Sequence, residues 1–441
     1  MDQGTIQAFP LKELFIDTLT RDVKVSTCIL DLIDNSVDSY IRHKIEDRRT
    51  IDIELSSESF RIKDTCGGIE KDRLEHEVFK FGSVLKGNLA TLGIYGIGLK
   101  RSIFKLGNLI SIKTDDGHNY CEKESFDVAA WKQDSTPPWT IPYSYGESRL
   151  NGKLPYTEIQ ISNLTPDARD KFSSIVFINN LMETLKRTYC LFIAENLDFS
   201  FNGQRVEEYP LIVPDDQEYS PQVFLEDYDD IKIKIICFID PSRGKRLEKA
   251  VNRVGWNIFC NKRLILANDT SATTGWIGEN RQDITKLPRY HQLFNEFRGL
   301  VFLDSNDPAK LPLNTSKSDL NTESAIYEYV LEKMVKTARP VIDYIYGKDS
   351  EVLDQEEQIN ETATKPDPNF NPSVKRAMEL TAAQTFKAPP KTVETAPETT
   401  GIQYSKPKEL VERVKRNVGV TSNREVGEYT FDYYVKMEEV Q

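Results

Sequence analysis

The sequence predicts an α+β fold with two successive mixed regions followed by a small helical segment. Runs that alternate apolar and polar residues, such as 50–55 (TIDIEL) and 108–114 (NLISIKT), lie among helical segments up to about residue 205. Alternation with a period of two is typical of half-buried strands. Further strand-like runs, beginning at 231–239 (IKIKIICFI), precede an apolar helical pattern at 324–345. Because 441 residues exceed what one ordinary core holds, we expect at least two domains.

These patterns divide the chain into four expected segments, 1–205, 206–348, 349–400 and 401–441. The first two are the α/β domains. The third is rich in Glu, Thr, Pro, Asn and Gln, a composition that buries little apolar surface and predicts a flexible linker. In the fourth segment we expect two helices, the first opened by a proline and closed by Gly419, the second with its own cap.

Composition excludes several classes of protein. With 39% hydrophobic and 29% charged residues, the chain has the composition of a globular protein. It contains no apolar run long enough to cross a bilayer, and its first residues lack the basic and apolar parts of a signal peptide. We therefore expect a cytoplasmic protein with no membrane partner.

Metal and nucleic-acid binding are also constrained by composition. The six cysteines are scattered without a C-x-x-C pair, and there are only four histidines, so we expect reduced thiols and no structural zinc. The net charge of −12 argues against a globally basic nucleic-acid binder. This net charge does not exclude a local basic patch that binds nucleic acid.

The first chemical motif is the helical run 28–40 (CILDLIDNSVDSY). At about 100° per residue, Asp31, Asn35 and Asp38 share a narrow stripe, and the large apolar residues take the opposite face. One face is then core and the other faces a ligand. Taken alone, an ordinary amphipathic helix with a solvated side is the simpler interpretation.

The second motif, 61–74 (RIKDTCGGIEKDRL), places a strand end at Asp64 and then a glycine pair that includes Gly68. Glycine permits positive φ and lets a base or ribose approach the backbone closely. The Asp64 carboxylate can accept a hydrogen bond from an exocyclic amine. A tight turn that happens to contain Asp and Gly is the alternative.

The third motif, 92–102 (LGIYGIGLKRS), is a glycine-rich loop that leads into a helix expected to begin near Leu99. Backbone N–H groups at a helix N-terminus, with a lysine close by, make a phosphate site. The candidate nucleotide-binding residues of this loop are Gly93, Tyr95, Gly96, Ile97, Gly98, Leu99 and Lys100.

In this order and spacing, the three motifs resemble the N, G1 and G2 boxes of the GHKL ATPases, the superfamily of DNA gyrase B, MutL, MORC proteins and the ninety-kilodalton heat-shock chaperone. The resemblance implies the Bergerat α/β sandwich with ATP and magnesium as ligands. It implies that Asn35 holds magnesium, that Asp64 reads the adenine amino group and that the glycine loop closes as a lid over the phosphates. Thr157 stands where the family has a threonine that assists adenine recognition, without the glycine that usually precedes it.

Two positions depart from the family pattern. The family's general base is a glutamate four residues before the magnesium asparagine, and here that place holds Asp31. A carboxylate one methylene shorter can still activate water, but the reach for base catalysis is tight, so slow hydrolysis stays open. The usual first glycine of the second box is Cys66, which we interpret as a small buried thiol.

The second region resembles the transducer domain of the gyrase, MutL and MORC branch. The resemblance rests on 255–266 (GWNIFCNKRLIL) and on 311–321 (LPLNTSKSDLN). The latter resembles the loop whose switch lysine contacts the γ-phosphate, which implies that role for Lys317. The likeness spans about residues 12–345 and is closest to bacterial MORC-like ATP-binding proteins.

The sequence is therefore interpreted as an ATPase whose Mg-ATP binding and hydrolysis drive lid closure and homodimerisation. The resemblance suggests action on DNA, including defence against foreign DNA. Three alternatives stay open: a nucleotide-gated clamp or sensor with little hydrolysis, a chaperone-like protein remodeller, and a scaffold that no longer binds nucleotide. Fold-level kinship does not fix the substrate.

Overall fold

The structure is a computed structural model, and it describes residues 11–80, 92, 96–133, 138–240, 254–278, 285–314, 317, 319–357, 364–366, 373–389, 391–393, 405–420 and 422–438. The chain divides into two compact units. One comprises Met1–Ile359 with Pro366–Lys391, and the other comprises Asn360–Lys365 with Thr392–Gln441.

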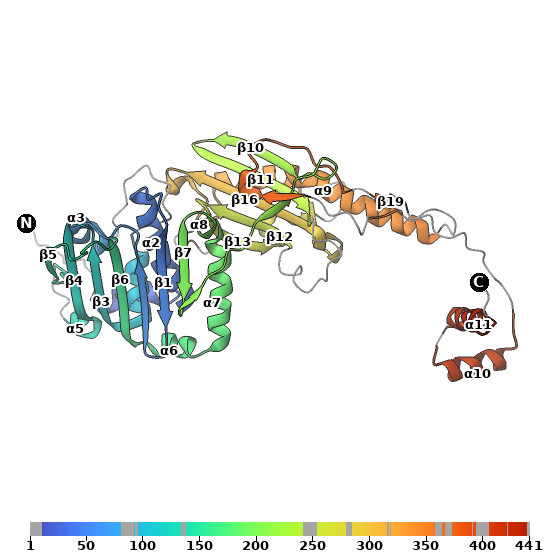
Figure 1. Cartoon of the computed structure of the whole chain (residues 1–441), viewed down its shortest axis with the longest axis horizontal. Helices are drawn as coiled ribbons and strands as arrows, with labels where there is room; N and C mark the ends of the chain where they lie inside the picture. The colour runs from blue at the N-terminus through green and yellow to red at the C-terminus, as the bar shows by residue number, and fades with distance from the viewer. Residues whose placement is uncertain are drawn as a thin grey trace, which may run out of the picture. The chain divides into compact units, whose positions relative to one another are not determined.

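The first region of the larger unit is built on an eight-stranded sheet (Figure 1). All neighbouring strands are antiparallel except β1 and β7, which are parallel. In sheet order the strands are β5 (Ser144–Glu147), β4 (Asn119–Asp127), β3 (Gly107–Asp115), β6 (Tyr156–Leu164), β2 (Ser59–Asp64), β1 (Arg49–Leu55), β7 (Leu197–Phe201) and β8 (Gln204–Arg205).

Helices cover the buried face of this sheet, with α2 and α4 packed against each other and against its strands. The helix α2 begins at Val25 and turns its large apolar side chains into the core, because these residues recur at helical spacing. The helical elements of this region are α1 (Lys12–Thr20), α2 (Val25–Arg42), α3 (Lys71–Arg73), the π-helical turn η1 (Leu74–Val78), α4 (Gly98–Leu106), α5 (Val128–Gln133), α6 (Pro166–Phe172), α7 (Ile175–Thr188) and α8 (Cys190–Ala194).

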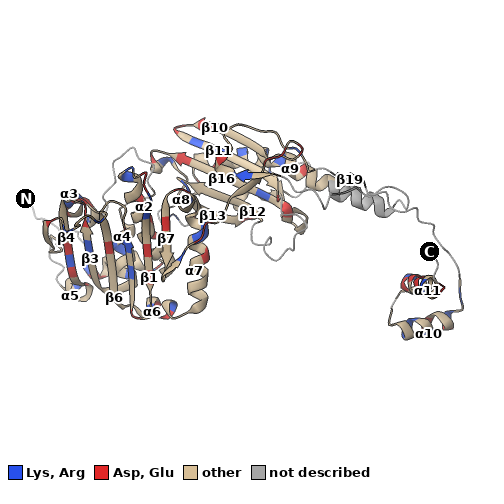
Figure 2. Cartoon of the chain, in the orientation of Figure 1, with Lys and Arg blue, Asp and Glu red and all other residues tan. Residues whose placement is uncertain are grey.

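The strands alternate between a buried and a polar face, as their sequence pattern predicts. In β2, Phe60, Ile62 and Asp64 are buried, and the residues between them are partly exposed. The polar face carries cross-strand ion pairs, such as Arg61 with Glu158 at 3.2 Å. Charged side chains of both signs are interspersed on these strands (Figure 2), so the net charge is not gathered into one block there.

The second region is a five-stranded sheet backed by a long helix (Figure 1). Its order is β10 (Gln222–Tyr228), β11 (Ile231–Ile239), β16 (Phe297–Ser305), β12 (Gly255–Cys260) and β13 (Arg263–Asp269), with β12 and β16 parallel. The helix α9 (Ala325–Glu357) packs on β10 and β11 and runs past the expected boundary at 348. Shorter elements of this region are β9 (Ile212–Pro214), η3 (Ala272–Thr274), β14 (Trp276–Gly278), β15 (Leu287–Pro288), η4 (Gln292–Glu296), η5 (Pro308–Lys310), β18 (Val374–Arg376) and η6 (Ala377–Glu379). The paired strands β17 (Thr364–Pro366) and β19 (Lys391–Val393) each span a sequence boundary between the two units.

Residues 373–389 correct the prediction of a flexible linker over 349–400. This segment, which we call the return strap, pairs β18 with β9 and bridges Gln384 to Val223 of β10. Ala377 and Leu380 are buried in a cluster against the second sheet. A composition poor in apolar residues hid these anchors, because two well-placed side chains are enough to fix a short segment whose backbone joins a sheet edge.

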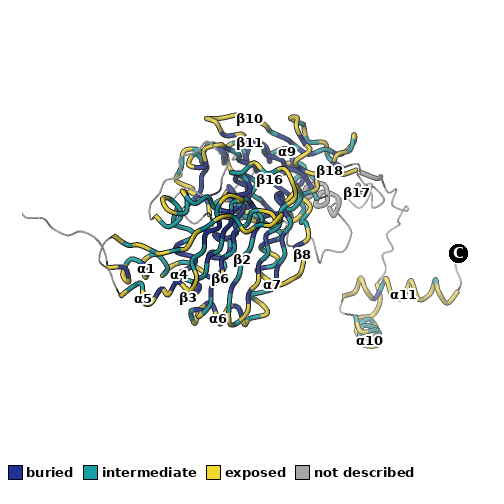
Figure 3. The backbone as a smooth tube through the Cα atoms, turned by 60° about the vertical axis from the view of Figure 1, so that its left-hand side comes forward, coloured by how far each residue is buried: buried dark blue, intermediate teal, exposed yellow. Residues whose placement is uncertain are grey.

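The smaller unit contains the helices α10 (Lys408–Val418) and α11 (Asn423–Met437). Gly419 closes α10 with φ +74°, and Ser422 and Glu425 form a capping box at the start of α11. Figure 3 shows both helices mostly exposed, in contrast to the buried strands of the two sheets. Among the residues described in these helices, Val426 alone is buried.

All six cysteines are buried and unpaired. In the part of the chain that the structure describes, no helix has the length and apolarity needed to span a membrane, and no group of three or more His, Cys, Asp or Glu side chains forms a metal cluster.

Candidate functional site

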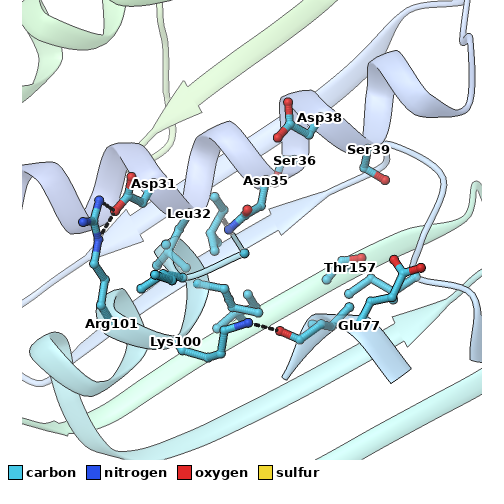
Figure 4. Close-up of a pocket in the computed structure, with 18 of the residues that line it drawn as sticks. Asp31, Leu32, Asn35, Ser36, Asp38, Ser39, Glu77, Lys100, Arg101 and Thr157 are labelled. Carbon is cyan, nitrogen blue, oxygen red and sulfur yellow. Dashed lines mark hydrogen bonds and ion pairs between the residues drawn. The ribbon is translucent and has the colours of Figure 1, made fainter. Parts of the chain in front are cut away.

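A cavity of about 340 Å³ opens where α2, the strands β2 and β6, the start of α4 and a loop of the second region meet. It gathers most of the sequence-predicted site residues, whose close-up is shown in Figure 4. Those that line it are Asp31, Asn35, Asp38, Asp64, Gly96, Ile97, Gly98, Leu99, Lys100, Thr157 and Lys317. Gly68 precedes Ile69 of the lining, and Gly93 and Tyr95 lie outside the described residues.

The polar stripe of α2 faces this cavity. Within 31–40, Asn35 is exposed and every other residue is buried. Figure 4 shows Asn35 pointing from α2 toward the side on which Lys100 lies. Asp38 is buried and accepts a hydrogen bond from the backbone N–H of Leu92, so it holds the chain just before the glycine loop. Asn35 is thus the residue of the stripe that is open to a ligand.

Asp31 is held by an arginine of the neighbouring helix. The Nη2 and Nε atoms of Arg101 donate to Asp31 Oδ2 at 2.6 and 2.9 Å, and the Ser102 hydroxyl lies 3.4 Å from the same oxygen. Burial raises the pKa of the Asp31 carboxyl, against the opposing charges of Lys317 and Arg101. The residue expected to act as a base therefore already has a cationic partner (Figure 4).

Asp64 closes the inner end of the cavity. The Ser36 hydroxyl donates to its Oδ2 at 2.8 Å, and the backbone N–H of Cys66 donates to its Oδ1 at 2.9 Å. Burial raises the pKa of Asp64 to about 6 despite these hydrogen bonds. Thr157 sits opposite Asp64 in the register of β2 and β6, which brings these two candidates side by side although 93 positions separate them in the sequence.

The glycine pair after Asp64 is required by its backbone. Gly67 and Gly68 have φ of +110° and +74°, and a Cβ on Gly68 would lie 2.4 Å from the Asp115 carbonyl oxygen. Such a position excludes other residues. Cys66 is outside the left-handed region and fully buried, so its side chain replaces the family's first glycine without straining the turn.

The start of α4 forms the opposite wall. Gly96, Ile97, Gly98 and Leu99 line the cavity where α4 begins at Gly98, close to the predicted start at Leu99. The first N–H groups of a helix have no intrahelical partner and favour anions. The geometry therefore offers backbone donors to phosphate oxygens at this end.

Lys100 is engaged differently from the sequence-based expectation. Its Nζ donates to the carbonyls of Val78 and Lys80 at 2.9 and 2.8 Å, which ties α4 to the end of η1 (Figure 4). Burial lowers the pKa of Lys100 to about 8. A direct role in phosphate binding would require this ammonium to leave the two carbonyls.

The second region reaches the cavity through the loop that carries Lys317. The Lys317 Nζ lies 3.3 Å from Oδ2 of Asp34 on α2, and Arg263 Nε donates to Oδ1 of the same carboxylate at 2.8 Å. Tyr189 Oη is 2.7 Å from that Oδ1. Burial alone would raise the pKa of Asp34, but the positive charges of Arg263 and Lys317 outweigh the effect of burial, and the pKa of Asp34 is lowered.

Sequence reasoning missed Asp34, Arg263 and Arg101. Asp34 lies inside the first motif, but at 100° per residue it falls about 40° beyond the edge of the stripe formed by Asp31, Asn35 and Asp38, so the stripe did not include it. Arg263 was a signal that could have been used, since it is a charged residue directly before the apolar run 264–267 of its strand. Arg101 follows Lys100 directly, and nothing in the local pattern separates their roles.

The donor set fits Mg-ATP. A buried carboxylate with a neighbouring threonine suits adenine, and a helix N-terminus suits phosphates. The exposed Asn35 amide would supply an oxygen for magnesium, which takes few protein ligands when it is bound with a nucleotide.

Comparison with known proteins bears on one part of the chain. Among the curated proteins, none matches this sequence. Residues 23–150, which include α2, β2 and α4, match the family model described as "Histidine kinase-, DNA gyrase B-, and HSP90-like ATPase", and this match supports placing that segment in the GHKL superfamily of ATPases.

Proposed function

We propose that the protein binds Mg-ATP in the cavity beside α2 and hydrolyses it. The observation that carries this proposal is that the exposed Asn35, the buried Asp64 and the N-terminus of α4 line one cavity. These residues come from the segment whose family model is that of GHKL-type ATPases.

In this proposal adenine binds at the Asp64 end. The Asp64 carboxylate accepts a hydrogen bond from the exocyclic amine, and the neighbouring Thr157 hydroxyl assists. Gly68 lets the nucleotide approach the backbone. The family's preceding glycine is absent, so Thr157 contributes less than Asp64.

The phosphates lie toward α4. Backbone N–H groups from Gly96 to Leu99 donate to phosphate oxygens. The family resemblance implies that Gly93 and Tyr95, which lie outside the described residues, belong to the lid. Asn35 holds magnesium, which neutralises phosphate charge when bound. Asp38 anchors the lid through Leu92.

Hydrolysis requires a base and a countercharge. Asp31 orients and activates the attacking water, and Lys317 stabilises the charge on the terminal phosphate. Because Arg101 donates twice to Oδ2 of Asp31, this oxygen is not free to accept a proton from water until the pair rearranges. This pair favours slow turnover, and it favours a nucleotide-gated clamp or sensor as the second candidate function.

The substrate of the cycle is proposed from the family resemblance alone. We propose a cytoplasmic protein that forms a homodimer on binding ATP and acts on DNA or on a partner protein, the latter in the manner of a chaperone-like remodeller. Isolation of the protein with a trapped ATP analogue, with and without nuclease, distinguishes these partners by what copurifies.

Asn35→Ala tests the proposed site directly. Because Asn35 is exposed, its loss leaves stability within about 0.5 kcal/mol and abolishes magnesium-dependent nucleotide binding, measured by calorimetry. Asn179→Ala is the matched control, since Asn179 is an exposed asparagine of α7 away from the cavity lining. Equal affinities for Mg-ATP in wild type and Asn35→Ala would refute the site.

A further inference from the structure

A buried arginine joins the second sheet to the candidate ATP site. Arg263 begins β13, directly after a tight turn in which Asn261 and Lys262 have φ of +45° and +66°. Its side chain is 4% exposed. The guanidinium makes two directed contacts: Nε donates to Asp34 Oδ1 at 2.8 Å, and Nη1 donates to the backbone carbonyl of Lys317 at 2.6 Å.

The contact with Lys317 is made to its backbone and not to its side chain. Lys317 has φ +50°, a left-handed conformation that is uncommon for residues other than glycine. Its N–H donates to the Asn314 carbonyl at 3.1 Å, and its own carbonyl accepts from Arg263. The position of the Lys317 Cα is therefore fixed even when its side chain moves.

Arg263 also neutralises the Asp34 carboxylate, which is the ion-pair partner of the Lys317 ammonium in this structure. Asp34 is fully buried and contacts both Arg263 and the Lys317 ammonium. Asp31 and Asp38, on the same helix as Asp34, also interact electrostatically with Lys317 and Asp34, and Arg101 of α4 pairs with Asp31. If the ammonium leaves Asp34, Arg263 still pairs with the carboxylate, so Asp34 keeps a charged partner.

We propose that Arg263 is a positioning residue that presents Lys317 to the cavity and lets its ammonium exchange between Asp34 and the terminal phosphate of ATP. This inference rests on the proposed function, because it assigns the phosphate as the second partner. Arg263 itself touches no nucleotide. It acts through the backbone of Lys317 and the charge of Asp34.

A double-mutant cycle tests the proposal. Calorimetry with a non-hydrolysable ATP analogue and with ADP, each with magnesium, is carried out on wild type, Arg263→Gln, Lys317→Met and the double variant. We expect Arg263→Gln to weaken analogue binding about tenfold or more, since a charge-assisted contact is lost. ADP binding changes less than about twofold, and the analogue loses nothing further in the Lys317→Met background.

Arg298→Gln is the matched control. Arg298 is another buried arginine of the second sheet, paired with Asp240 at 2.6 Å, and it does not line the cavity. Its loss reports what removal of any buried arginine does to folding and binding. Equal weakening of analogue and ADP in Arg263→Gln, or the same weakening with Lys317 already removed, would show that Arg263 serves only to support the fold.

A measurement without nucleotide separates this inference from the proposed function. The Lys317 side chain is 12% exposed in the structure, so an amine-acetylating reagent should modify it slowly. In Arg263→Gln we expect faster modification of Lys317 by mass spectrometry, with the exposed Lys336 unchanged. Unchanged Lys317 labelling in a folded variant would overturn the inference, whereas wild type that binds neither nucleotide would overturn the proposed function alone.

Arg263→Lys keeps the test valid if Arg263→Gln does not fold by circular dichroism. A lysine ammonium can neutralise Asp34 but cannot span both partners as the guanidinium fork does. We expect it to restore folding and ADP binding while Lys317 remains more reactive than in wild type. Wild-type Lys317 reactivity in Arg263→Lys would contradict the backbone contact as the positioning element.

Discussion

At the scale of single residues, the ion pair between Asp31 and Arg101 sets what the site can do. The two side chains are 2% and 10% exposed, so the pair is almost fully withdrawn from water. Removing one partner of a buried ion pair leaves the other charge buried without compensation, whereas removing both partners does not. Any test of Asp31 as a base must therefore separate its chemistry from its structural pairing.

Asp31→Asn is expected to abolish turnover and to lower the free energy of unfolding by about 3 kcal/mol, because Arg101 is left without its charged partner. Adding Arg101→Gln should recover most of the stability but none of the turnover. Urea unfolding and phosphate release measure the two effects. Asp17→Asn, which breaks the exposed pair with Lys132, should change stability by less than about 1 kcal/mol. Turnover that returns in the double variant would contradict Asp31 as the base.

The buried Asp64 carboxyl makes the stability of the fold depend on pH. Its pKa is raised by burial from 3.8 to about 6, so the folded chain holds its proton more tightly than the unfolded chain. Between about pH 4 and 6 the native state carries the extra proton, and stability therefore falls as pH rises through this window. The difference of about two pH units corresponds to about 3 kcal/mol above pH 6.

Asp64→Asn should remove this pH dependence. We expect the variant to be more stable than wild type at about pH 7, by up to about 3 kcal/mol, and the two to converge near pH 4. Nucleotide affinity of wild type should fall below about pH 6, since a protonated Asp64 is a poorer acceptor for the adenine amine. Unfolding curves and calorimetry across this range provide the check, and a constant stability difference from pH 4 to 7 would disprove the assignment.

At the scale of elements, short sequence patterns were sufficient to predict the helix ends that depend only on neighbouring residues. The caps at Gly419 and Ser422 and the start of α4 at Gly98 follow from residues within one turn of each boundary. The return strap was missed because its order comes from β9 and β10, about 160 residues earlier in the chain. Composition describes what a segment buries on average, and it does not register a few specific anchors.

Lys234 of β11 is one such anchor, and Lys234→Met should release the strap. Its Nζ donates to the carbonyls of Ala377, Met378 and Leu380 at 3.1, 3.4 and 3.0 Å. Their loss is expected to increase hydrogen exchange over 373–389 and to cost about 1–3 kcal/mol. Lys232→Met is the control, since Lys232 is exposed on the same strand. Unaltered exchange in the strap would show that its backbone pairing and buried side chains hold it without Lys234.

At the scale of the whole molecule, the three motifs identified the cavity because each is contiguous and the packing of α2 on α4 and β2 brings them together. Asp64 and Thr157 meet through antiparallel pairing of β2 and β6. The contacts of Asp34 with Arg263 and Lys317 span 229 and 283 positions, and periodicity within one element carries no information about such pairs. The resemblance of the second region indicated Lys317, but not the arginine that holds it.

Nucleotide-dependent dimerisation is the prediction at this scale. Leu11 and Leu14 at the start of α1 are 64% and 62% exposed, an apolar surface that suits exchange with a second copy. Binding shifts an association equilibrium only through different affinities for the two states. Light scattering should show the mass doubling with a saturating ATP analogue and magnesium, and no change for Asn35→Ala. An unchanged wild-type mass would exclude this coupling.

The buried cysteines can report how fast each region of the molecule opens. Thiol alkylation requires the thiolate, and burial raises the pKa of Cys28 and Cys190 to about 12 and that of Cys237 well above its ordinary value. Each thiol therefore reacts only when its surroundings open. Cys28 lies in α2 and Cys237 lies in β11. The alkylation rate of each cysteine, measured by mass spectrometry of its peptide, therefore reports how fast each region opens, and no label has to be introduced.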